Sequence, residues 1–357
     1  MKSDALTKKR LIELAEKYKT VEPKDVYKFL YQSTFGCGHM VSDTDAAVRY
    51  IKEEAKSAQP KAESAPEELD GDFCRVHLSV LDTGLSPETL GRLFYLSARE
   101  RTGDTEFFER RLSIAEELAA NEVFPFTAAK FKEAVAKYKK EGFPSVSHSP
   151  LYKERYKPAY RVIAKRFAPF IPLFSRLDRE LPRGKVTLAI EGGSGSGKST
   201  LGEILHELYG ACVLHMDDFF LRPEMRTPER LSEVGGNVDR ERFLLEVLTP
   251  LSCGEPIDYR RFDCTTGTLL PPERITQGRL TVVEGAYSMH PELAGFYSLS
   301  VFLDIDPALQ RERITARNGK LTERFFTEWI PLEVRYFSAT DIKSRCDLVI
   351  NVDYGIF

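Results

Sequence analysis

The sequence predicts an α/β protein in which a five-stranded parallel sheet flanked by helices follows a mostly α-helical N-terminal half. Three observations lead to this prediction. From about residue 183 onward, short β-rich apolar runs alternate with helical stretches. A glycine-rich segment separates the first of these runs from a helix. Before about residue 180, apolar residues recur at spacings of three and four, the period of a helix.

The N-terminal half is expected to be helical over several stretches. Ser86 is a helix cap, and Pro87 and Glu88 suit a first turn. Gly142 follows two lysines, as the end of a helix requires. Residues 55–72, rich in Ala, Ser, Pro and Glu, predict an exposed loop. The predicted helices lie near residues 5–18, 23–33, 43–57, 86–100, 105–120, 127–141 and 152–167.

The C-terminal half contains five near-continuous apolar runs, which are typical of the buried strands of a parallel sheet. The pattern changes near residues 181–184, where Pro and Gly interrupt a helix. We therefore predict a helical domain of unknown role over residues 1–180 and a second domain over residues 181–357. The predicted strands are 186–190, 212–215, 280–284, 299–305 and 348–351.

Composition indicates an intracellular protein that handles small molecules. The 357 residues carry a net charge of −3, which gives no general attraction to nucleic acid or to anionic membranes. The six cysteines show no spacing typical of a zinc site or a disulfide framework. Because the N-terminus lacks an apolar signal region and no stretch is long enough to span a bilayer, we expect a cytoplasmic location.

Residues 192–199 read Gly-Gly-Ser-Gly-Ser-Gly-Lys-Ser, a complete GxxxxGK[ST] phosphate-binding loop, or P-loop, between a predicted strand and a predicted helix. Glycines let successive backbone N–H groups turn toward a phosphate, Lys198 can reach the β- and γ-phosphates, and Ser199 can bind Mg²⁺. The sequence thus predicts a P-loop NTPase fold that binds ATP and Mg²⁺. The predicted nucleotide-binding residues are Gly192, Gly193, Ser194, Gly195, Ser196, Gly197, Lys198, Ser199 and Thr200.

Carboxylates follow two of the other predicted strands. Asp217 and Asp218 come directly after the second strand, and Glu284 ends the third. Ligands of open α/β folds bind at the carboxyl ends of the strands, so these groups are expected beside the P-loop. A carboxylate can orient an acceptor hydroxyl and take its proton, and others can bind Mg²⁺. A helix cap is the simpler interpretation of the aspartates.

Several arginines follow the fourth predicted strand and are candidates for neutralising the charge of a phosphate. Arg313 and Arg317 share one face of the predicted helix there, and Arg311 lies nearby. Arginines in such a place can close over a transferring phosphate and neutralise its charge. Taken singly, each arginine is more simply explained by a solvated helix face.

The chain from about residue 183 to 352 resembles the P-loop kinases of the uridine kinase, phosphoribulokinase and bacterial pantothenate kinase type. The resemblance rests on the P-loop and on the segments 217–220, 237–239, 256–259, 284–285 and 311–317. After Tyr259 the chain lacks the His-containing segment that contacts the base in uridine kinases, so the acceptor stays open.

This resemblance implies a role for each matching residue. Asp217 would be the general base, acting with Lys198 and with Arg313 and Arg317 of a lid. Ser199, Asp218 and Glu284 would hold Mg²⁺. The acceptor would lie against Asp239, Tyr259 and Arg260.

The N-terminal half offers weaker signals. Cys37 and His39 lie two residues apart on a glycine-rich turn, and Arg75, His77 and His148 can join them in a polar pocket. Residues 130–167 combine Lys and Arg with aromatic residues, as single-stranded nucleic acid requires, although aromatic residues packed inward explain the same pattern. Nucleic acid is therefore not the expected partner.

The function that we predict is ATP-dependent transfer of a phosphate to a hydroxyl of a uridine- or cytidine-like nucleoside or a similar metabolite. The alternatives are a nucleotide-gated ATPase switch and a nucleic-acid-binding module, in which the helical half binds the partner. A GTPase switch is disfavoured because the guanine-reading Asn-Lys-x-Asp motif is absent. The sequence leaves open the oligomeric state, including a homo-oligomer, and the choice between ATP and GTP.

Overall fold

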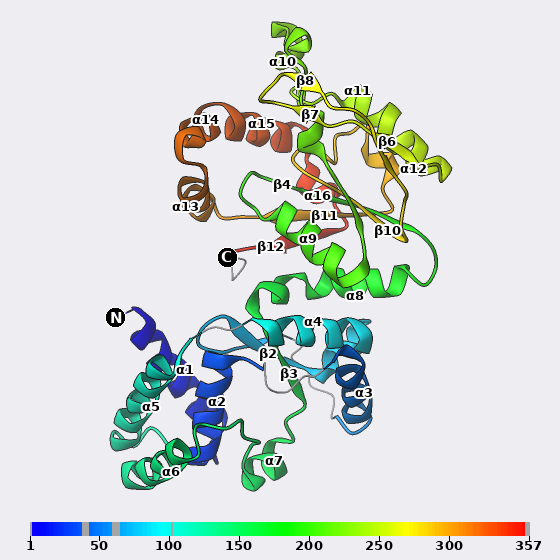
Figure 1. Cartoon of the computed structure of the whole chain (residues 1–357). Helices are drawn as coiled ribbons and strands as arrows, with labels where there is room; N and C mark the ends of the chain where they lie inside the picture. Colours follow the sequence, from blue (N-terminus) through cyan, green and yellow to red (C-terminus); the bar gives the residue numbers. More distant parts are fainter. Residues whose placement is uncertain (1, 38–42, 59–64, 101–102, 354–357) are drawn as a thin grey trace. The chain divides into compact units, whose positions relative to one another are not determined.

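The computed structural model describes residues 2–37, 43–58, 65–100 and 103–353. The chain divides into two compact units, Met1–Ile171 and Pro172–Ile356 (Figure 1). The division falls at the start of helix α8 (Ile171–Glu180), which therefore groups with the second unit.

The first unit is mostly helical, as predicted. Helix α4 begins at the predicted cap, where the Ser86 side chain accepts a hydrogen bond from the Thr89 N–H. Gly142, after helix α6, has a φ of +75° that favours glycine. The helices are α1 (Lys2–Lys17), α2 (Pro23–Phe35), α3 (Thr44–Ala55), α4 (Pro87–Arg99), α5 (Thr105–Ala120), α6 (Ala128–Lys140) and α7 (Pro150–Tyr156).

The helix predicted over residues 152–167 is wrong beyond Tyr156. Lys157 takes a left-handed φ of 43°, and Pro158 has no N–H to continue the helix. The chain then forms strand β3 (Tyr160–Ala164), which pairs antiparallel with β2 (Phe73–His77). With β1 (Glu67–Glu68), they make a three-stranded sheet that the helical pattern did not predict.

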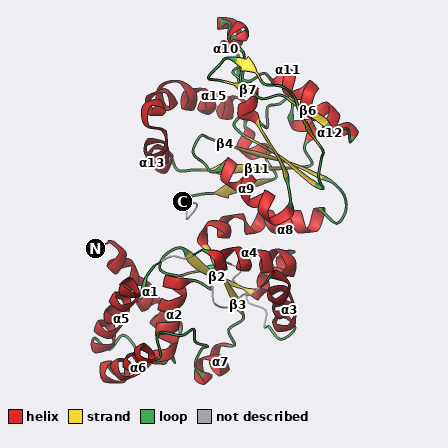
Figure 2. Cartoon of the chain, in the orientation of Figure 1, coloured by secondary structure: helices red, strands yellow, loops and turns green. Residues whose placement is uncertain are grey.

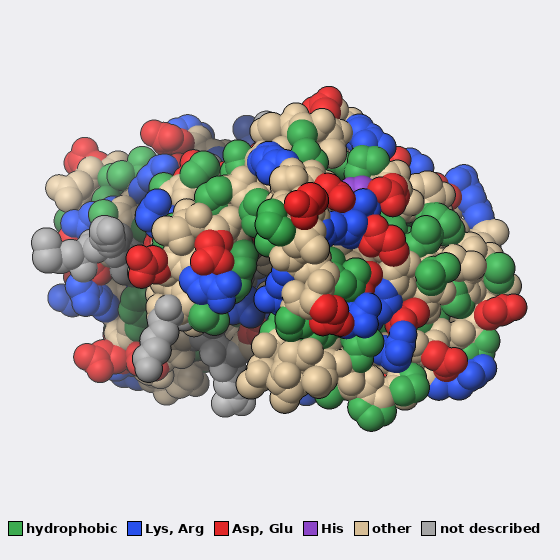
Figure 3. Space-filling model, turned by 90° about the horizontal axis from the view of Figure 1, so that it is seen from above, with side chains coloured by type: hydrophobic (Ala, Val, Ile, Leu, Met, Phe, Trp, Pro, Cys, Tyr) green, Lys and Arg blue, Asp and Glu red, His purple; other side chains and the backbone are tan. Residues whose placement is uncertain are grey.

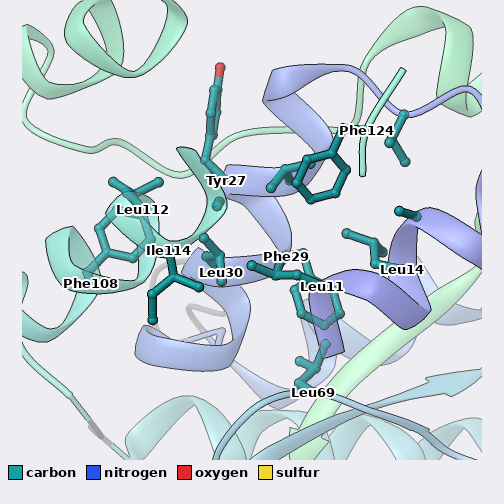
Figure 4. Close-up of a cluster of buried hydrophobic side chains, with 14 of the residues drawn as sticks. Leu11, Leu14, Tyr27, Phe29, Leu30, Leu69, Phe108, Leu112, Ile114 and Phe124 are labelled. Atoms are coloured by element: carbon teal, nitrogen blue, oxygen red, sulfur yellow. The ribbon is translucent and has the colours of Figure 1, made fainter. Parts of the chain in front are cut away.

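The core of the first unit lies between helices α1, α2 and α5 (Figure 4). Leu11 and Leu30 are fully buried, and Phe29 and Phe108 fill the space between the helices. Leu11 with Leu14, and Phe108 with Leu112, show the three- and four-residue spacings that predicted helices, because one face of each helix packs inward.

The second unit is built on the predicted five-stranded parallel sheet, with helices around it (Figure 2). Its order is β12-β11-β4-β10-β5, and every neighbouring pair is parallel. Leu188 and Ile190 of the central strand are fully buried, which explains the continuous apolar runs. The strands are β4 (Val186–Gly192), β5 (Cys212–His215), β10 (Leu280–Glu284), β11 (Leu299–Asp304) and β12 (Leu348–Asn351), and all five predictions are confirmed.

Helix α9 (Lys198–Tyr209) follows the P-loop and packs against β4, β10 and β5. Two small antiparallel pairs lie outside the main sheet: β6 (Ile257–Tyr259) with β9 (Glu273–Ile275), and β7 (Phe262–Asp263) with β8 (Thr268–Leu269). The other helices are α10 (Pro228–Ser232), α11 (Arg240–Phe243), α12 (Thr249–Cys253), α13 (Pro307–Asn318), α14 (Thr322–Arg324), α15 (Ile330–Thr340) and α16 (Ile342–Arg345). Across the described parts of both units, we find no helix with the length and apolar character of a membrane span.

Candidate nucleotide site

The P-loop joins the end of β4 to the start of α9. Its backbone takes positive φ angles at Gly192 (148°), Gly195 (77°) and Gly197 (93°). A Cβ on Gly192 would lie 2.7 Å from the carbonyl oxygen of Leu303 on β11, so the loop can pass the sheet only with glycine there. Because α9 starts at Lys198, the positive end of its dipole lies at the loop and favours an anion.

Lys198 is folded onto its own loop. Its Nζ donates hydrogen bonds to the carbonyl oxygens of Gly192 (2.8 Å) and Gly193 (3.0 Å), and the residue is 9% exposed. Neutral carbonyls are weaker partners for an ammonium group than phosphate oxygens. The structure therefore holds the lysine where phosphates can take over its hydrogen bonds.

Side chains from α13 and α15 hold the middle of the loop. Gln310 donates from Nε2 to the carbonyl of Ser194 (2.8 Å), and Glu333 accepts from the Ser194 N–H (2.9 Å) and hydroxyl (2.6 Å). Arg313 donates to the carbonyls of Gly195 (3.2 Å) and Val352 (3.0 Å). Arg313 thus contacts the loop backbone.

Arg317, the other arginine predicted for the lid, is exposed on α13. Arg313, by contrast, is only partly exposed and contacts the loop backbone. The shared role that we predict for them remains a prediction.

A buried carboxylate precedes the P-loop. Glu191 is fully buried, and its oxygens accept from the N–H groups of Gly192 (2.9 Å), Tyr287 (3.2 Å) and Met289 (3.1 Å) and from the Tyr336 hydroxyl (3.2 Å). Glu191 therefore connects the loop to the segment after β10 and to α15. Burial raises the pKa of Glu191 to about 7, although these donors and Lys198 act in the opposite direction.

We expect Glu191 to make the second unit less stable as the pH rises from 5 to about 7.5. Its folded pKa lies above that of an unfolded glutamate, so the folded state binds more protons in this range and the free energy of unfolding falls with pH. Urea unfolding followed by the fluorescence of Trp329, the single tryptophan, measures this change.

Glu191→Gln should flatten this pH dependence. The variant is expected to be less stable throughout, because its amide nitrogen faces N–H donors, so the slopes against pH are compared rather than the absolute values. Equal slopes for the variant and the parent would contradict the role assigned to Glu191.

At the carboxyl edge of the sheet, β5 and β10 bring His215 and Glu284 together. His215 Nδ1 lies 2.5 Å from Glu284 Oε1, and the two residues are paired in register. The hydrogen bond to Glu284 raises the pKa of His215. Burial raises the pKa of Glu284, but His215, Lys198 and the nearby Ser199 hydroxyl outweigh it, so the pKa is lowered and the carboxylate is ionised.

The two aspartates after β5 have different surroundings. Asp218 accepts a hydrogen bond from the Tyr259 hydroxyl (2.7 Å), whereas Asp217 is exposed at the site. Desolvation by the surrounding protein atoms raises the pKa of Asp217, as do the charges of Glu284 and Glu333, and Lys198 opposes them. The structure thus brings Asp217 into one electrostatic cluster with the loop lysine.

The predicted acceptor residues have partners of their own. Asp239, 2% exposed, caps α11 by accepting from the Arg242 N–H (3.1 Å). Tyr259, also 2% exposed, donates to Asp218 as described above. Arg260 pairs with Glu246. Their contact with an acceptor remains a prediction.

The oxygen groups near the loop suit Mg²⁺. The Ser199 side chain is exposed and lies close to the ionised Glu284 carboxylate, and both offer the hard oxygen ligands that Mg²⁺ prefers. Among the described residues, no three His, Cys, Asp or Glu side chains gather as a metal site.

Sequence reasoning missed Glu191, Gln310 and Glu333. Glu191 had a local signal, since it is a charged residue inside an apolar strand directly before the P-loop. Glu333 had none, because it contacts a loop residue 139 positions earlier. Only the fold shows that contact.

In the first unit, two of the polar residues singled out from the sequence share a buried cluster. His148 lies 2.9 Å from Asp25 and 2.6 Å from the Tyr160 hydroxyl. The Arg75 guanidinium lies over the Tyr160 ring at 4.6 Å and donates to Gln32 (2.7 Å). His77 instead bonds to Ser79 (2.9 Å), and His39 lies outside the described residues.

The basic and aromatic segment 130–167 is explained by packing. Phe131, Tyr138, Tyr152 and Phe167 are all at most 2% exposed, so these rings belong to the core and cannot stack on bases. On the face seen in Figure 3, basic and acidic side chains are interspersed. The structure therefore offers no support for the nucleic-acid-binding module.

The parallel sheet and its loop place the second unit among the P-loop nucleotide-binding proteins. Strand β4, which leads into the loop, lies between β10 and β11, so the carboxyl ends of the neighbouring strands surround the phosphate site. Within this class, the C-terminal half is related to the kinases of the uridine kinase and phosphoribulokinase type.

Two relatives support this relationship. The phosphoribulokinase of Synechocystis sp. (strain ATCC 27184 / PCC 6803 / Kazusa) is 27% identical over 125 residues, which cover 34% of this chain and 38% of that protein. The uridine kinase of Geobacillus kaustophilus (strain HTA426) is 28% identical over 152 residues, 40% of this chain and 71% of that protein. No family model matches the chain.

Solved structures resemble about half of the chain. A possible uridine kinase from Bacillus stearothermophilus is 21% identical, with a TM-score of 0.35, and covers 50% of this chain and 98% of its own. YFH7 from Saccharomyces cerevisiae is 16% identical, with a TM-score of 0.39, and covers 50% and 95%.

Proposed function

We propose that the protein is a kinase that transfers the γ-phosphate of ATP to a hydroxyl of a small metabolite, either a uridine- or cytidine-like nucleoside or a similar hydroxylated compound. One observation carries the proposal: the Asp217 side chain is exposed and its charge interacts with that of Lys198, while the neighbouring Asp218 accepts a hydrogen bond from Tyr259. Nucleotide binding alone does not require such a carboxylate. Phosphoryl transfer to a hydroxyl does.

The nucleotide would bind through the P-loop. Backbone N–H groups of residues 192–200 and the N-terminus of α9 would hold its phosphates, and Lys198 would leave the carbonyls of its own loop to neutralise them. Ser199 and Glu284, with Asp218 nearby, are the oxygen groups that would hold Mg²⁺. When bound, this ion would offset charge on the transferring phosphate.

The acceptor would enter against Asp217. The carboxylate would accept a hydrogen bond from the acceptor hydroxyl, align its oxygen with the γ-phosphate and take up its proton during transfer. Asp239, Tyr259 and Arg260 are proposed to shape the acceptor side, and Arg313 and Arg317 the lid. Names of relatives suggest uridine kinase and phosphoribulokinase chemistry, both of which use a hydroxyl acceptor.

The test is ADP production from Mg-ATP with a panel of acceptors: uridine, cytidine, other nucleosides, pantothenate, glycerate and sugar phosphates. Lys198→Ala serves as the blank. Lys185→Ala is the matched control, because it removes an exposed lysine directly before β4. Acceptor-dependent ADP release that is lost only in Lys198→Ala would support the kinase and identify its substrate.

Two other outcomes would overturn the proposal. ADP release that needs no acceptor would favour the nucleotide-gated ATPase switch. If the protein bound Mg-ATP but released no ADP with any acceptor, the result would favour the binding module.

A further inference from the structure

A carboxylate accepts a hydrogen bond from a backbone N–H of the phosphate loop. Glu333, on α15, is 5% exposed, and its two oxygens accept from the N–H (2.9 Å) and the hydroxyl (2.6 Å) of Ser194. A Cβ built on Gly193 would lie 3.6 Å from Glu333 Oε2, so the loop packs closely on this group. Gln310 holds the carbonyl of Ser194 at the same time. Ser194 is therefore held through its N–H and hydroxyl by Glu333 and through its carbonyl by Gln310.

Charged groups of both signs lie around this carboxylate and the loop. Glu333 and Glu284 both act on Asp217 through their charges, and Lys198 acts on it with the opposite sign. Two further basic groups lie nearby: His215 is engaged by Glu284, and Arg313 donates to the carbonyl oxygens of Gly195 and Val352. These positive groups already have protein partners, whereas Glu333 adds negative charge to a loop whose ligand is itself a polyanion.

An anion at the loop would meet the charge of Glu333, because this carboxylate hydrogen-bonds Ser194 in the middle of the loop. Repulsion between like charges is strong at such distances where the groups are shielded from water. The Mg²⁺ complex of a nucleotide carries less negative charge than the free nucleotide, so the penalty is smaller for the complex. Selectivity between the two forms follows from this difference.

We propose that Glu333 is a specificity-determining residue of the nucleotide site: its carboxylate on Ser194 makes the loop select the magnesium complex of ATP over free ATP. The inference rests on the proposed function only in requiring that the loop bind ATP. The identity of the acceptor does not enter.

The test is isothermal titration of the full chain with ATP in EDTA and with Mg-ATP. Glu333→Gln keeps the shape and can still accept from the Ser194 N–H, but it removes the charge. We expect this variant to bind metal-free ATP about tenfold more tightly than the parent, with a clearly smaller gain for Mg-ATP. Glu333→Asp keeps the charge and should bind metal-free ATP as the parent does.

Glu328→Gln is the matched control. Glu328 lies five positions earlier, is exposed and pairs with Arg324, so the same change of charge there should alter neither affinity. Thermal unfolding of each variant checks that the fold is kept.

Three results would overturn the inference: no gain in Glu333→Gln, an equal gain for both forms of ATP, or the same gain in Glu333→Asp. Failure of the kinase proposal looks different. A parent that prefers Mg-ATP and loses that preference in Glu333→Gln, but phosphorylates no acceptor, would sustain this inference and refute the kinase.

Discussion

Asp217→Asn is expected to lower kcat by about 10³ while the affinity for Mg-ATP changes little, because a positioned base commonly contributes factors of this size. The amide keeps the shape of the side chain but cannot take the acceptor proton. Asp217 is exposed, so its substitution should not disturb the core. Steady-state kinetics with the acceptor from the panel, together with titration of Mg-ATP, measures both quantities.

The pH profile adds an independent readout. Since the pKa of Asp217 is raised, the carboxylate loses its proton only at a higher pH than an ordinary aspartate. The rate of the parent should therefore rise with pH on the acid side as this group ionises, and that limb should vanish in Asp217→Asn. A neighbouring carboxylate that acts in its place would leave the limb intact.

Asp45→Asn provides the control for this substitution. Asp45 lies in the first turn of α3 in the first unit and is exposed, so the same chemical change is made outside the residues proposed for the site. It should retain the parental rate. If Asp217→Asn also turned over at the parental rate, the assignment of the base would be wrong.

Lys198→Ala is expected to reduce kcat/KM by at least about 10³ and to weaken the binding of Mg-ATP, because interactions with the transferring phosphates supply most of the catalysis in this reaction class. The structure adds a reason for a large effect. Lys198 opposes the charges of Asp217, Glu284 and Glu333, so its removal leaves a phosphate site lined with negative groups. Titration of Mg-ATP and single-turnover kinetics separate binding from chemistry.

Loss of stability should not mimic this effect, and urea unfolding of the variant checks this. Lys198 donates two hydrogen bonds to carbonyls within its own loop, and water can replace the lost donor there once the side chain is shortened. Lys185→Ala should behave as the parent does. Undiminished Mg-ATP binding in Lys198→Ala would contradict the proposed position of the phosphates.

Patterns along the chain predicted the parts of the fold that depend on neighbouring residues. The five strands of the sheet were recognisable because both faces of a parallel sheet are buried, as Leu188 and Ile190 show. The P-loop was recognisable because its glycines need positive φ angles in a short stretch. The helices of the first unit were predicted in the same way, because each has one apolar face that packs inward.

Patterns failed where a distant partner decides the structure. The residues of β3 continue a helical spacing, but Pro158 ends the helix and β2, more than eighty positions earlier, supplies the backbone partners that make a strand. Asp217 and Asp218 are the same residue type at adjacent positions. The hydrogen bond from the Tyr259 hydroxyl to Asp218, which only the folded structure shows, gives them different surroundings.

By itself, the sequence determined that this protein carries a phosphate-binding loop on a five-stranded parallel sheet, because those features arise from residues close together in the chain. Only the tertiary structure decided which charges surround that loop. Glu333 contacts the loop from α15 and Gln310 from α13, more than a hundred positions along the chain, so no local pattern encodes these contacts.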